Sequence, residues 1–379
     1  MKKTVILVIE NSIDVTGALK SIVRIAYDLQ PFFDFIFVIP KKSKGRFWIE
    51  KFGFNKIYEL RMIELSKRLF SFLLYFPFLL MNALSLIRII KQERVTLIHS
   101  NDLYNMLPVV IRLLGNPTPY VCHIRFMPDH FPAWIFNFWI KRHLRYAEQV
   151  VAVSKSVSNL LPQHPKISVI YGELPLGESY HFHGKDRIYF VFLYLSNFMT
   201  GKGQELALEA FAQVHKGLPN WRLRFVGSDM GLKKNKEYVR KLMSLSEKLN
   251  IAEKIEWAEF TNDVEWEYKH ADIVLNFSQS ESFSITCLEA LYYGRPLIAS
   301  DCGGPAEIID HGVTGILVPN KNIKEMAEAM KQMALQSDKR EAMGTAARIV
   351  VREKFSVENT SFRLKEIFSW VLDRNNEIK

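Results

Sequence analysis

The sequence predicts an α/β protein of two domains, each built on a parallel sheet with helices on both faces. The first observation is a series of short, continuously apolar runs, as expected of strands that are buried on both faces. The second is that helical stretches separate these runs, which is typical of doubly wound sheets. The third is the length of 379 residues, which exceeds what one hydrophobic core usually organises.

The apolar runs form two series. The first series comprises residues 5–9, 33–39, 95–99, 119–124, 149–153 and 167–170. The second comprises residues 188–195, 222–226, 254–257, 272–276, 296–300 and 315–318. Residues 171–186 are rich in Gly, Pro and polar residues and predict a linker. We therefore expect an N-terminal Rossmann-like domain over 1–172, completed by a C-terminal helix over 357–379, and a C-terminal Rossmann-like domain over 173–356. The two domains would face a central cleft at the carboxyl ends of their strands.

The composition of the chain indicates which binding partners and which cellular compartment to expect. The formal net charge of +10 favours acidic partners such as phosphorylated small molecules, anionic lipid or nucleic acid. Three cysteines, odd in number and without metal-type spacing, favour a reducing compartment over a disulfide framework. The first apolar run is short and ends in Glu10, which favours a buried strand over a signal peptide. We therefore expect a cytoplasmic protein.

Two aromatic and basic segments suggest contact with a membrane surface. Residues 69–87 carry no charge over 19 positions, but Pro77 and Asn82 interrupt them, and basic residues flank them on both sides. This pattern favours a buried or surface-lying helix that docks on anionic lipid over one that spans the membrane. Residues 130–150 mix aromatic and basic residues and fit either a core helix with a solvated basic face or a membrane-facing helix. No recognised nucleic-acid-binding motif accompanies the basic residues.

The residues that predict chemistry lie after the strand at 272–276. Glu281 and Glu289 stand eight positions apart, and a helix is predicted to begin at about Ser284 or Thr286. The first turn of a helix presents free backbone N–H groups and a partial positive charge, which suit a phosphate. Glu281 could accept hydrogen bonds from a sugar and Glu289 from a vicinal diol. The arrangement fits a nucleotide-sugar, whereas the bland alternative is two solvated helix glutamates.

Further candidates follow other strands. Lys202 and Gly203 open a helix after the strand at 188–195, where a cation could reach a diphosphate. Gly17 lies at the first strand-to-helix turn, and His123 lies at the end of the run 119–124, where a structural role is the alternative. All of these residues follow carboxyl ends of strands, so we expect them to face one cleft.

The segment "ESFSITCLEALYYGRPLIASDCGGPAEIIDHGVTGILVP" (281–319) resembles the E-x(7)-E region of family 4 glycosyltransferases, which are retaining enzymes with the GT-B fold. The resemblance extends through Lys202–Gly203 and residues 221–227 and 268–283. It is strong over the C-terminal half and weaker over the N-terminal half. There it rests on the Gly17 turn, on "VTLIHSND" and on "VVAVSKSV".

The resemblance implies a role for each candidate. Glu281 would bind hydroxyls of the donor sugar, Glu289 would bind the ribose, and Lys202 would neutralise the leaving phosphate. Gly17 would let the N-terminal loop approach the diphosphate, and His123 would reach the donor sugar. Backbone N–H groups of one segment would bind the diphosphate or sugar, namely those around Ser282, Phe283 and Ser284, with Thr286.

The sequence also departs from the family pattern. Asn197 stands where an arginine is usual, and Ser284 stands where glycine is common. The glycine pair after the first strand is reduced to Gly17, and "YGELP" replaces the usual Asn-Gly after residues 167–170. Diphosphate charge would then rest more heavily on Lys202 and the helix N-terminus.

We expect a metal-independent, retaining hexosyltransferase, because no Asp-x-Asp motif occurs in the chain. It would need no cofactor besides a UDP- or GDP-linked donor. Its acceptor would be a glycan or a lipid-linked glycan of cell-surface polysaccharide or lipopolysaccharide biosynthesis, at the inner face of the cytoplasmic membrane. The alternatives are a sugar-nucleotide epimerase of the same fold and an inactive, membrane-associated binding protein.

Overall fold

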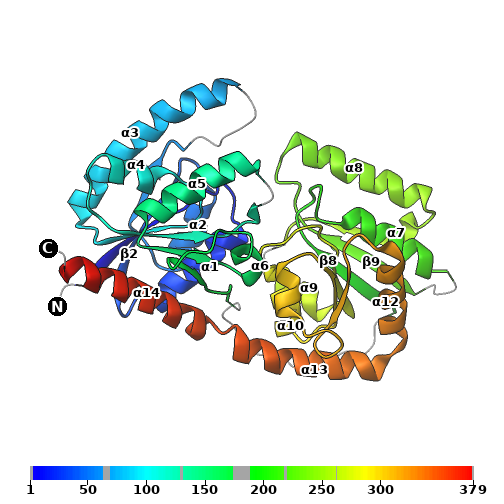
Figure 1. The fold of residues 1–379 in the computed structure, drawn as a ribbon. Helices are drawn as coiled ribbons and strands as arrows, with labels where there is room; N and C mark the ends of the chain where they lie inside the picture. Colours follow the sequence, from blue (N-terminus) through cyan, green and yellow to red (C-terminus); the bar gives the residue numbers. More distant parts are fainter. Residues whose placement is uncertain are drawn as a thin grey trace. The chain divides into compact units, whose positions relative to one another are not determined.

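A computed structural model describes residues 3–62, 69–128, 131–173, 188–216, 220–261 and 263–377. The chain divides into two compact units (Figure 1). Unit 1 comprises Met1–Glu173 with Val357–Lys379, and unit 2 comprises Leu174–Ser356. Most of the predicted linker, residues 174–186, lies outside the described residues.

Unit 1 contains a seven-stranded parallel sheet in the order β3-β2-β1-β4-β5-β6-β7. The strands are β1 (Thr4–Ile9), β2 (Phe33–Pro40), β3 (Ile57–Leu60), β4 (Leu97–Ser100), β5 (Tyr120–Ile124), β6 (Gln149–Ala152) and β7 (Ile167–Val169). The register places Ile6 opposite Phe35 and Leu97. The central strands are buried on both faces, which is why their apolar runs are continuous.

Helices cover both faces of this sheet (Figure 1). They are α1 (Gly17–Asp28), α2 (Gly45–Lys51), α3 (Leu69–Glu93), α4 (Leu107–Leu113), α5 (Ala133–Tyr146), α6 (Lys155–Ser158) and α14 (Val357–Glu377). Among the described residues, none of the helices is both long and apolar enough to cross a membrane. A helix was expected over residues 69–87, and α3 runs through this segment with Pro77 inside it.

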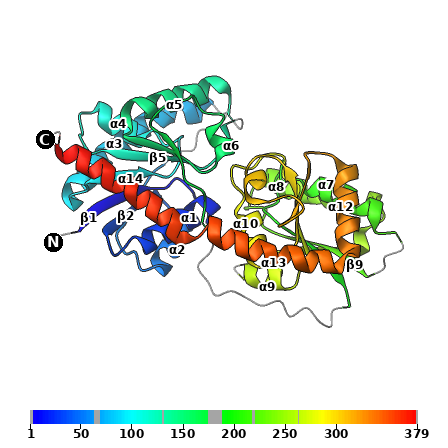
Figure 2. The same cartoon turned by 60° about the horizontal axis from the view of Figure 1, so that its bottom comes forward.

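The C-terminal helix α14 returns from unit 2 and packs along α1 (Figure 2). Its residues Leu364, Phe368 and Val371 are fully buried in the core of unit 1. Phe368 meets Phe33 edge to face, with ring centroids 5.9 Å apart. Each large apolar side chain buried in this way contributes about 1.5–3 kcal/mol, so α14 is an integral part of unit 1.

Unit 2 contains a six-stranded parallel sheet in the order β10-β9-β8-β11-β12-β13. The strands are β8 (Phe190–Leu195), β9 (Trp221–Val226), β10 (Ile255–Ala258), β11 (Ile273–Asn276), β12 (Leu297–Asp301) and β13 (Ile316–Pro319). The helices are α7 (Gln204–Val214), α8 (Lys233–Lys248), α9 (Val264–Lys269), α10 (Ile285–Tyr292), α11 (Gly304–Ile308), α12 (Ile323–Leu335) and α13 (Ser337–Lys354), with a short 3-10 helix η2 (Ala252–Lys254). Each unit is therefore a doubly wound α/β sheet, as predicted.

The strand order creates one switch point in each sheet. In unit 2 the chain leaves β8 toward β9 on one side and leaves β11 toward β12 on the other. In unit 1 the same divergence occurs between β1 and β4. Loops that leave adjacent strands in opposite directions open a crevice at the carboxyl edge, where such sheets bind ligands. Ligands are therefore expected at the loops after β8 and β11 in unit 2, and at those after β1 and β4 in unit 1.

Substitution of two glycines can test how closely the loop after β8 approaches the loop after β11. Gly201 and Gly203 both have a positive φ, of 92° and 76°, but only Gly203 lacks room, because a Cβ there would lie 1.9 Å from the carbonyl oxygen of Phe277. Gly201→Ala should cost about 1–2 kcal/mol of unfolding free energy from its backbone conformation. Gly203→Ala should cost about 1–3 kcal/mol more from overpacking. Urea unfolding of both variants measures the difference, and equal losses would contradict the close approach.

Candidate active site

An ion pair between Lys202 and Glu281 lies at the switch point of unit 2. Lys202 follows β8 and Glu281 follows β11. The lysine Nζ lies 2.7 Å from Oε1 of Glu281, and Ser278 Oγ donates a hydrogen bond of 2.8 Å to the same oxygen. The side chain of Lys202 is 28% exposed and that of Glu281 is 15% exposed, so the pair is partly shielded from solvent but still accessible to a ligand.

The local electrostatics keep the lysine charged. Burial by itself would lower the pKa of Lys202, but the charge and hydrogen bond of Glu281 outweigh it and raise that pKa. A partly desolvated cation beside a carboxylate interacts strongly with a phosphate that enters the site, because solvent screens it less than a surface lysine.

Tyr194 holds the two loops of the ion pair together. This buried side chain of β8 donates a hydrogen bond to the carbonyl oxygen of Lys202. Its hydroxyl oxygen also accepts a hydrogen bond of 2.7 Å from the backbone N–H of Phe277. The left-handed Gly203 then begins α7 in direct contact with the loop after β11. One buried hydroxyl and one glycine therefore set the distance between Lys202 and the segment that carries Glu281.

The backbone of Glu281 is fixed from the other side by the glycine loop after β12. Its N–H donates to the carbonyl oxygen of Cys302 at 3.1 Å, and its carbonyl oxygen accepts from Gly304 N at 2.8 Å. A Cβ on Gly304 would lie 2.3 Å from the Cα of Phe283. Gly304 allows this close packing because it has no Cβ.

Helix α10 begins at the residues that the sequence predicted. Ser284 is its N-cap, with φ 73°, and its Oγ accepts hydrogen bonds from Cys287 N at 3.4 Å and from Asn276 Nδ2 at 3.0 Å. A left-handed backbone explains why glycine is common at this position in the family that the segment resembles. Phe283 is buried and meets Phe355 edge to face, whereas Ser282 and Thr286 are half-buried. The polar residues of this turn can therefore contact a ligand while Phe283 anchors it.

Glu289 lies one turn inside α10 and is 7% exposed. Its Oε2 accepts a hydrogen bond of 3.2 Å from the hydroxyl of Tyr268, which is fully buried on α9. Burial, and then the charge of Glu289, raise the pKa of Tyr268, so this tyrosine remains a hydrogen-bond donor. The interpretation of Glu281 and Glu289 as solvated helix glutamates is therefore wrong.

Comparison with known proteins agrees with this site. Residues 180–350 match the family model described as glycosyl transferases group 1, and residues 49–172 match glycosyltransferase family 4. The chain belongs to the family 4 glycosyltransferases. The structure of Anabaena Alr3699/HepE in complex with UDP and glucose has the same GT-B fold, with a TM-score of 0.80 and 19% identity over 96% of this chain and 99% of that one.

Other glycosyltransferases are similar over different lengths. The human alpha-1,3/1,6-mannosyltransferase ALG2 is 30% identical over 177 residues, which are 45% of this chain and 42% of that protein. The apo lipopolysaccharide outer core galactosyltransferase WaaB has a TM-score of 0.71 and 19% identity over 97% of this chain and 99% of that one. The chain matches less than half of the length of these relatives, namely 42% of ALG2 and 37% of an uncharacterized glycosyltransferase of Haemophilus influenzae.

Two of the predicted site residues lie in unit 1. Gly17 is the first residue of α1, and Thr16 caps that helix by accepting a hydrogen bond from Leu19 N. His123 lies inside β5 and is 1% exposed, with its ring 5.6 Å from the ring of His99. Burial holds the pKa of His123 well below its usual value, so the imidazole is neutral. The contact of His123 with a donor sugar stays a prediction, and it requires this covered ring to become exposed.

A polar cluster that was not predicted from the sequence lies at the switch point of unit 1. Glu10 follows β1, Asn101 and Asp102 follow β4, and Arg125 follows β5. Asn101 Nδ2 donates to Glu10, Arg125 Nε donates to Asn101 Oδ1 at 3.0 Å, and Arg125 N donates to Asp102 Oδ1 at 3.2 Å. Arg125 also donates to Ser21 Oγ at 2.8 Å. Each polar residue stands just after an apolar run, which was the available signal.

The carboxyl of Asp102 is unusual within this cluster. Burial raises its pKa to about 8, although the backbone N–H groups of Arg125 and Leu103 lower it. Asp102 Oδ1 accepts both of these hydrogen bonds. The residue therefore holds a proton at neutral pH and can donate a hydrogen bond. Within the described ranges, no group of three or more His, Cys, Asp or Glu residues is arranged to hold a metal ion.

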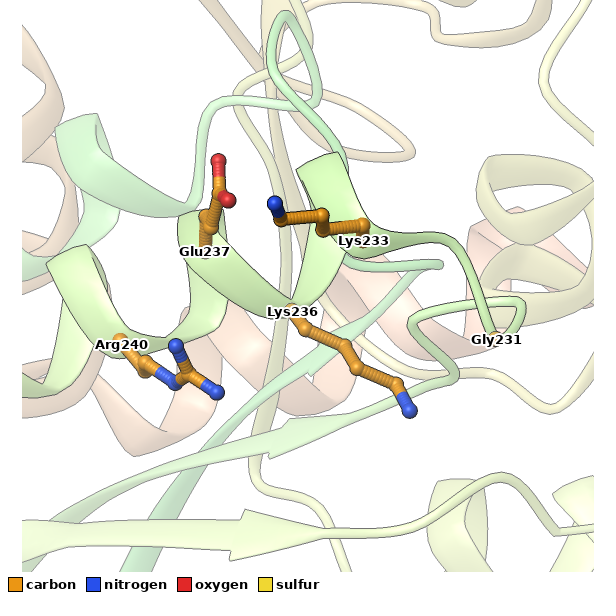
Figure 3. A pocket seen from close by; sticks show the side chains of 5 residues that line it. All are labelled: Gly231, Lys233, Lys236, Glu237 and Arg240. Carbon is orange, nitrogen blue, oxygen red and sulfur yellow. The ribbon is translucent and has the colours of Figure 1, made fainter.

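A separate hollow lies on the exposed side of α8 (Figure 3). It measures about 300 Å³ and is lined by Gly231, Lys233, Lys236, Glu237 and Arg240. None of the predicted site residues lines it. Its basic side chains therefore serve as controls for the charge of Lys202.

The proton on Asp102 can be tested through stability. The folded pKa of about 8 lies above the ordinary value of 3.8, so between these pH values the folded protein holds a proton that the unfolded chain has released. Stability from Asp102 is therefore present at low pH and lost as the pH rises toward 8. Asp102→Asn imitates the protonated carboxyl and keeps its acceptor oxygen. The Tm of this variant, relative to the wild type, should rise between about pH 5 and about pH 8.5. A constant difference would contradict the assignment.

Proposed function

We propose that the protein transfers a hexose from a UDP- or GDP-linked donor to a glycan or lipid-linked acceptor, with retention of anomeric configuration and without a metal ion. The observation that carries this proposal is the ion pair of Lys202 and Glu281, held beside the N-terminus of α10 at a sheet switch point. A cation and a helix N-terminus suit a diphosphate, and the adjacent carboxylate suits the hydroxyls of the attached sugar.

Binding of the donor would break the ion pair between Lys202 and Glu281, and each of the two residues would then contact the donor. The leaving diphosphate would take Lys202 as its counterion, and Glu281 would turn from the ammonium to accept hydrogen bonds from the sugar. Ser278 already donates to Glu281 Oε1, so the carboxylate remains oriented during this exchange. Glu289, oriented by Tyr268, would accept hydrogen bonds from the ribose hydroxyls.

In the reaction, the bond between the anomeric carbon and the diphosphate oxygen breaks, and a bond forms from the acceptor oxygen to the same carbon. The acceptor hydroxyl loses its proton to the leaving phosphate, so the step needs no protein base. Negative charge grows on the phosphate in the transition state. Lys202 and the N–H groups at the start of α10 stabilise that charge as fixed, preorganised donors.

Three of the similar proteins support a hexose donor and a cell-surface glycan as acceptor. The structure of Alr3699/HepE contains UDP and glucose, ALG2 is named a mannosyltransferase, and WaaB is named a lipopolysaccharide outer core galactosyltransferase. These names favour a hexose donor and an acceptor that belongs to a cell-surface glycan. The net charge of +10 supports a cytoplasmic position at an anionic membrane surface. Nucleic acid is not a partner in this proposal.

The catalytic role of the ion pair can be tested by removing each charge. Glu281→Gln and Lys202→Gln should each lower kcat/KM for transfer by about 100-fold or more, as expected when a group that stabilises transition-state charge is lost. Lys233→Gln, which removes a basic charge from the hollow at α8, is the matched control and should leave transfer unchanged. The assay follows radiolabelled sugar from UDP- or GDP-hexoses into a membrane lipid extract.

Two results would contradict this function. Full transfer activity in Glu281→Gln would exclude the proposed site. Conversion of the nucleotide-sugar at the same rate with and without acceptor would instead indicate a sugar-nucleotide epimerase. An inactive binding protein would retain nucleotide affinity and release no nucleotide under any condition.

Binding experiments should distinguish the roles of Glu281 and Glu289. Glu289→Gln should weaken the binding of UDP and of a UDP-hexose equally, by about tenfold (~1.5 kcal/mol), because both ligands carry the ribose. Glu281→Gln should weaken only the UDP-hexose, because UDP lacks the sugar. Isothermal titration calorimetry measures both affinities, with GDP and GDP-mannose as the parallel series. A loss of UDP affinity in Glu281→Gln as large as in Glu289→Gln would contradict the assignment of Glu281 to the donor sugar alone.

A further inference from the structure

Helix α3 exposes an apolar face to solvent. Its residues Phe76, Leu80, Met81 and Leu84 are between 45% and 56% exposed. Their spacing of four, five and eight residues from Phe76 places them on one side of the helix. Ala83, Leu86 and Ile90 share a neighbouring face of the helix and are buried. The helix therefore packs one face into the core of unit 1 and exposes a second apolar face.

The exposed face of α3 becomes basic toward its C-terminal end. Arg88 and Lys91 are exposed, and at 3.6 residues per turn they continue the line of Leu80, Met81 and Leu84. Arg94 follows directly after the helix and is also exposed. The predicted flanking residues Lys67 and Arg68 lie outside the described residues.

Helix α5 has the same arrangement. Trp134 and Phe138 are 71% and 49% exposed, and Lys141 and Arg145 continue that face, both exposed. The guanidinium of Arg142 lies 5.3 Å from the ring centre of Phe138. Phe136 and Trp139 point into the core, so the segment is both a core helix and an exposed aromatic face. His143 does not belong to the basic face, because it is fully buried and bonds the carbonyl of Leu103.

The sheet topology aligns these two faces. In a parallel sheet each connecting helix begins near the carboxyl edge and runs back toward the amino edge. The apolar halves of α3 and α5 therefore lie near the carboxyl edge of unit 1, and their basic ends lie away from it. Helix α4 contacts both helices, and both views show the three grouped on one side of unit 1 (Figures 1 and 2). We call the exposed residues of α3 and α5 the α3–α5 face.

We propose that the α3–α5 face docks unit 1 on an anionic lipid bilayer. Phe76, Leu80, Leu84, Trp134 and Phe138 would enter the boundary between headgroups and acyl chains, and the basic residues would contact lipid phosphates. An amphipathic helix that lies in the interface, with Trp, Phe and Leu toward the lipid, binds through apolar burial together with charge attraction. The combination of exposed aromatic rings with basic residues on the same face favours this partner over an acidic protein.

The position of the α3–α5 face also suggests how a lipid-linked acceptor reaches the protein, an inference that rests on the proposed function. The polar cluster of Glu10, Asn101, Asp102 and Arg125 lies at the carboxyl edge of the same sheet. The apolar halves of α3 and α5 begin at that edge. A bilayer in contact with them would present the glycan of a lipid-linked acceptor to the cluster. The donor site in unit 2 need not bind lipid for docking to occur.

The experiment is vesicle flotation of the full chain. Vesicles of phosphatidylcholine are compared with vesicles of phosphatidylcholine and phosphatidylglycerol. The wild type should partition at least tenfold more strongly to the anionic vesicles, and added salt should weaken this binding. The double substitution Leu80→Gln with Leu84→Gln, and separately Trp134→Gln, should each reduce the partition at least tenfold. Arg88→Gln with Lys91→Gln should abolish the preference for anionic vesicles.

Matched controls lie on α14 of the same unit. Phe362 and Trp370 are 59% and 47% exposed, and Phe362→Gln with Trp370→Gln should leave flotation unchanged. All substituted residues are exposed, so the Tm of each variant should equal that of the wild type.

Three outcomes overturn the proposal: equal binding to both vesicle types, equal loss of binding in the α14 control, or a dimer that the α3 substitutions dissociate, which would assign the face to a second copy of the chain. Flotation needs no donor and no turnover. A failure of docking is therefore distinguishable from a failure of the proposed transferase activity.

Discussion

The ion pair between Lys202 and Glu281 depends on the meeting of two loops that are 79 positions apart in the chain. The pairing of β8 with β11 brings the loops to the same point, and their opposite courses beyond the strands leave space between them. Tyr194 and Gly203 then set the separation of the loops. If this approach were looser, the lysine and the glutamate would become separate surface charges, and the tip of α10 would lose its neighbouring cation. The proposed chemistry thus depends on close backbone packing as much as on the charges themselves.

The two switch points carry different electrostatics. In unit 2 a cation and a helix N-terminus are paired with a single carboxylate, which suits a ligand that is anionic at one end and neutral at the other. In unit 1 the carboxyls of Glu10 and Asp102 stand near one guanidinium, and burial leaves Asp102 protonated at neutral pH. A buried cluster of this kind offers both hydrogen-bond donors and acceptors, which suits hydroxyl groups. The chemical division between a phosphorylated donor and a polyhydroxylated acceptor is therefore consistent with the side chains of each unit.

Much of the C-terminal half could be predicted from sequence, because its signals are local. Continuous apolar runs mark buried parallel strands, and the Ser284 turn followed by an apolar helix marks the start of α10. Other features depend on contacts that sequence spacing does not encode. His123 was predicted to reach a sugar, yet the same strand-end position in a fully covered sheet leaves its ring buried. The facing of the two domains across a cleft stays a prediction.

By itself, the sequence determined which elements form and which residues follow the strands, because hydrophobic periodicity and capping act over a few neighbouring residues. It also determined the family, through the order of motifs around Glu281 and Glu289. Only the tertiary structure decided which of these residues meet. The pairing of Lys202 with Glu281, the buried bond from Tyr268 to Glu289 and the cluster around Asp102 all join segments that are distant in the chain. The exposure of the α3–α5 face was decided in the same way, since a helix does not reveal which of its apolar sides a sheet will cover.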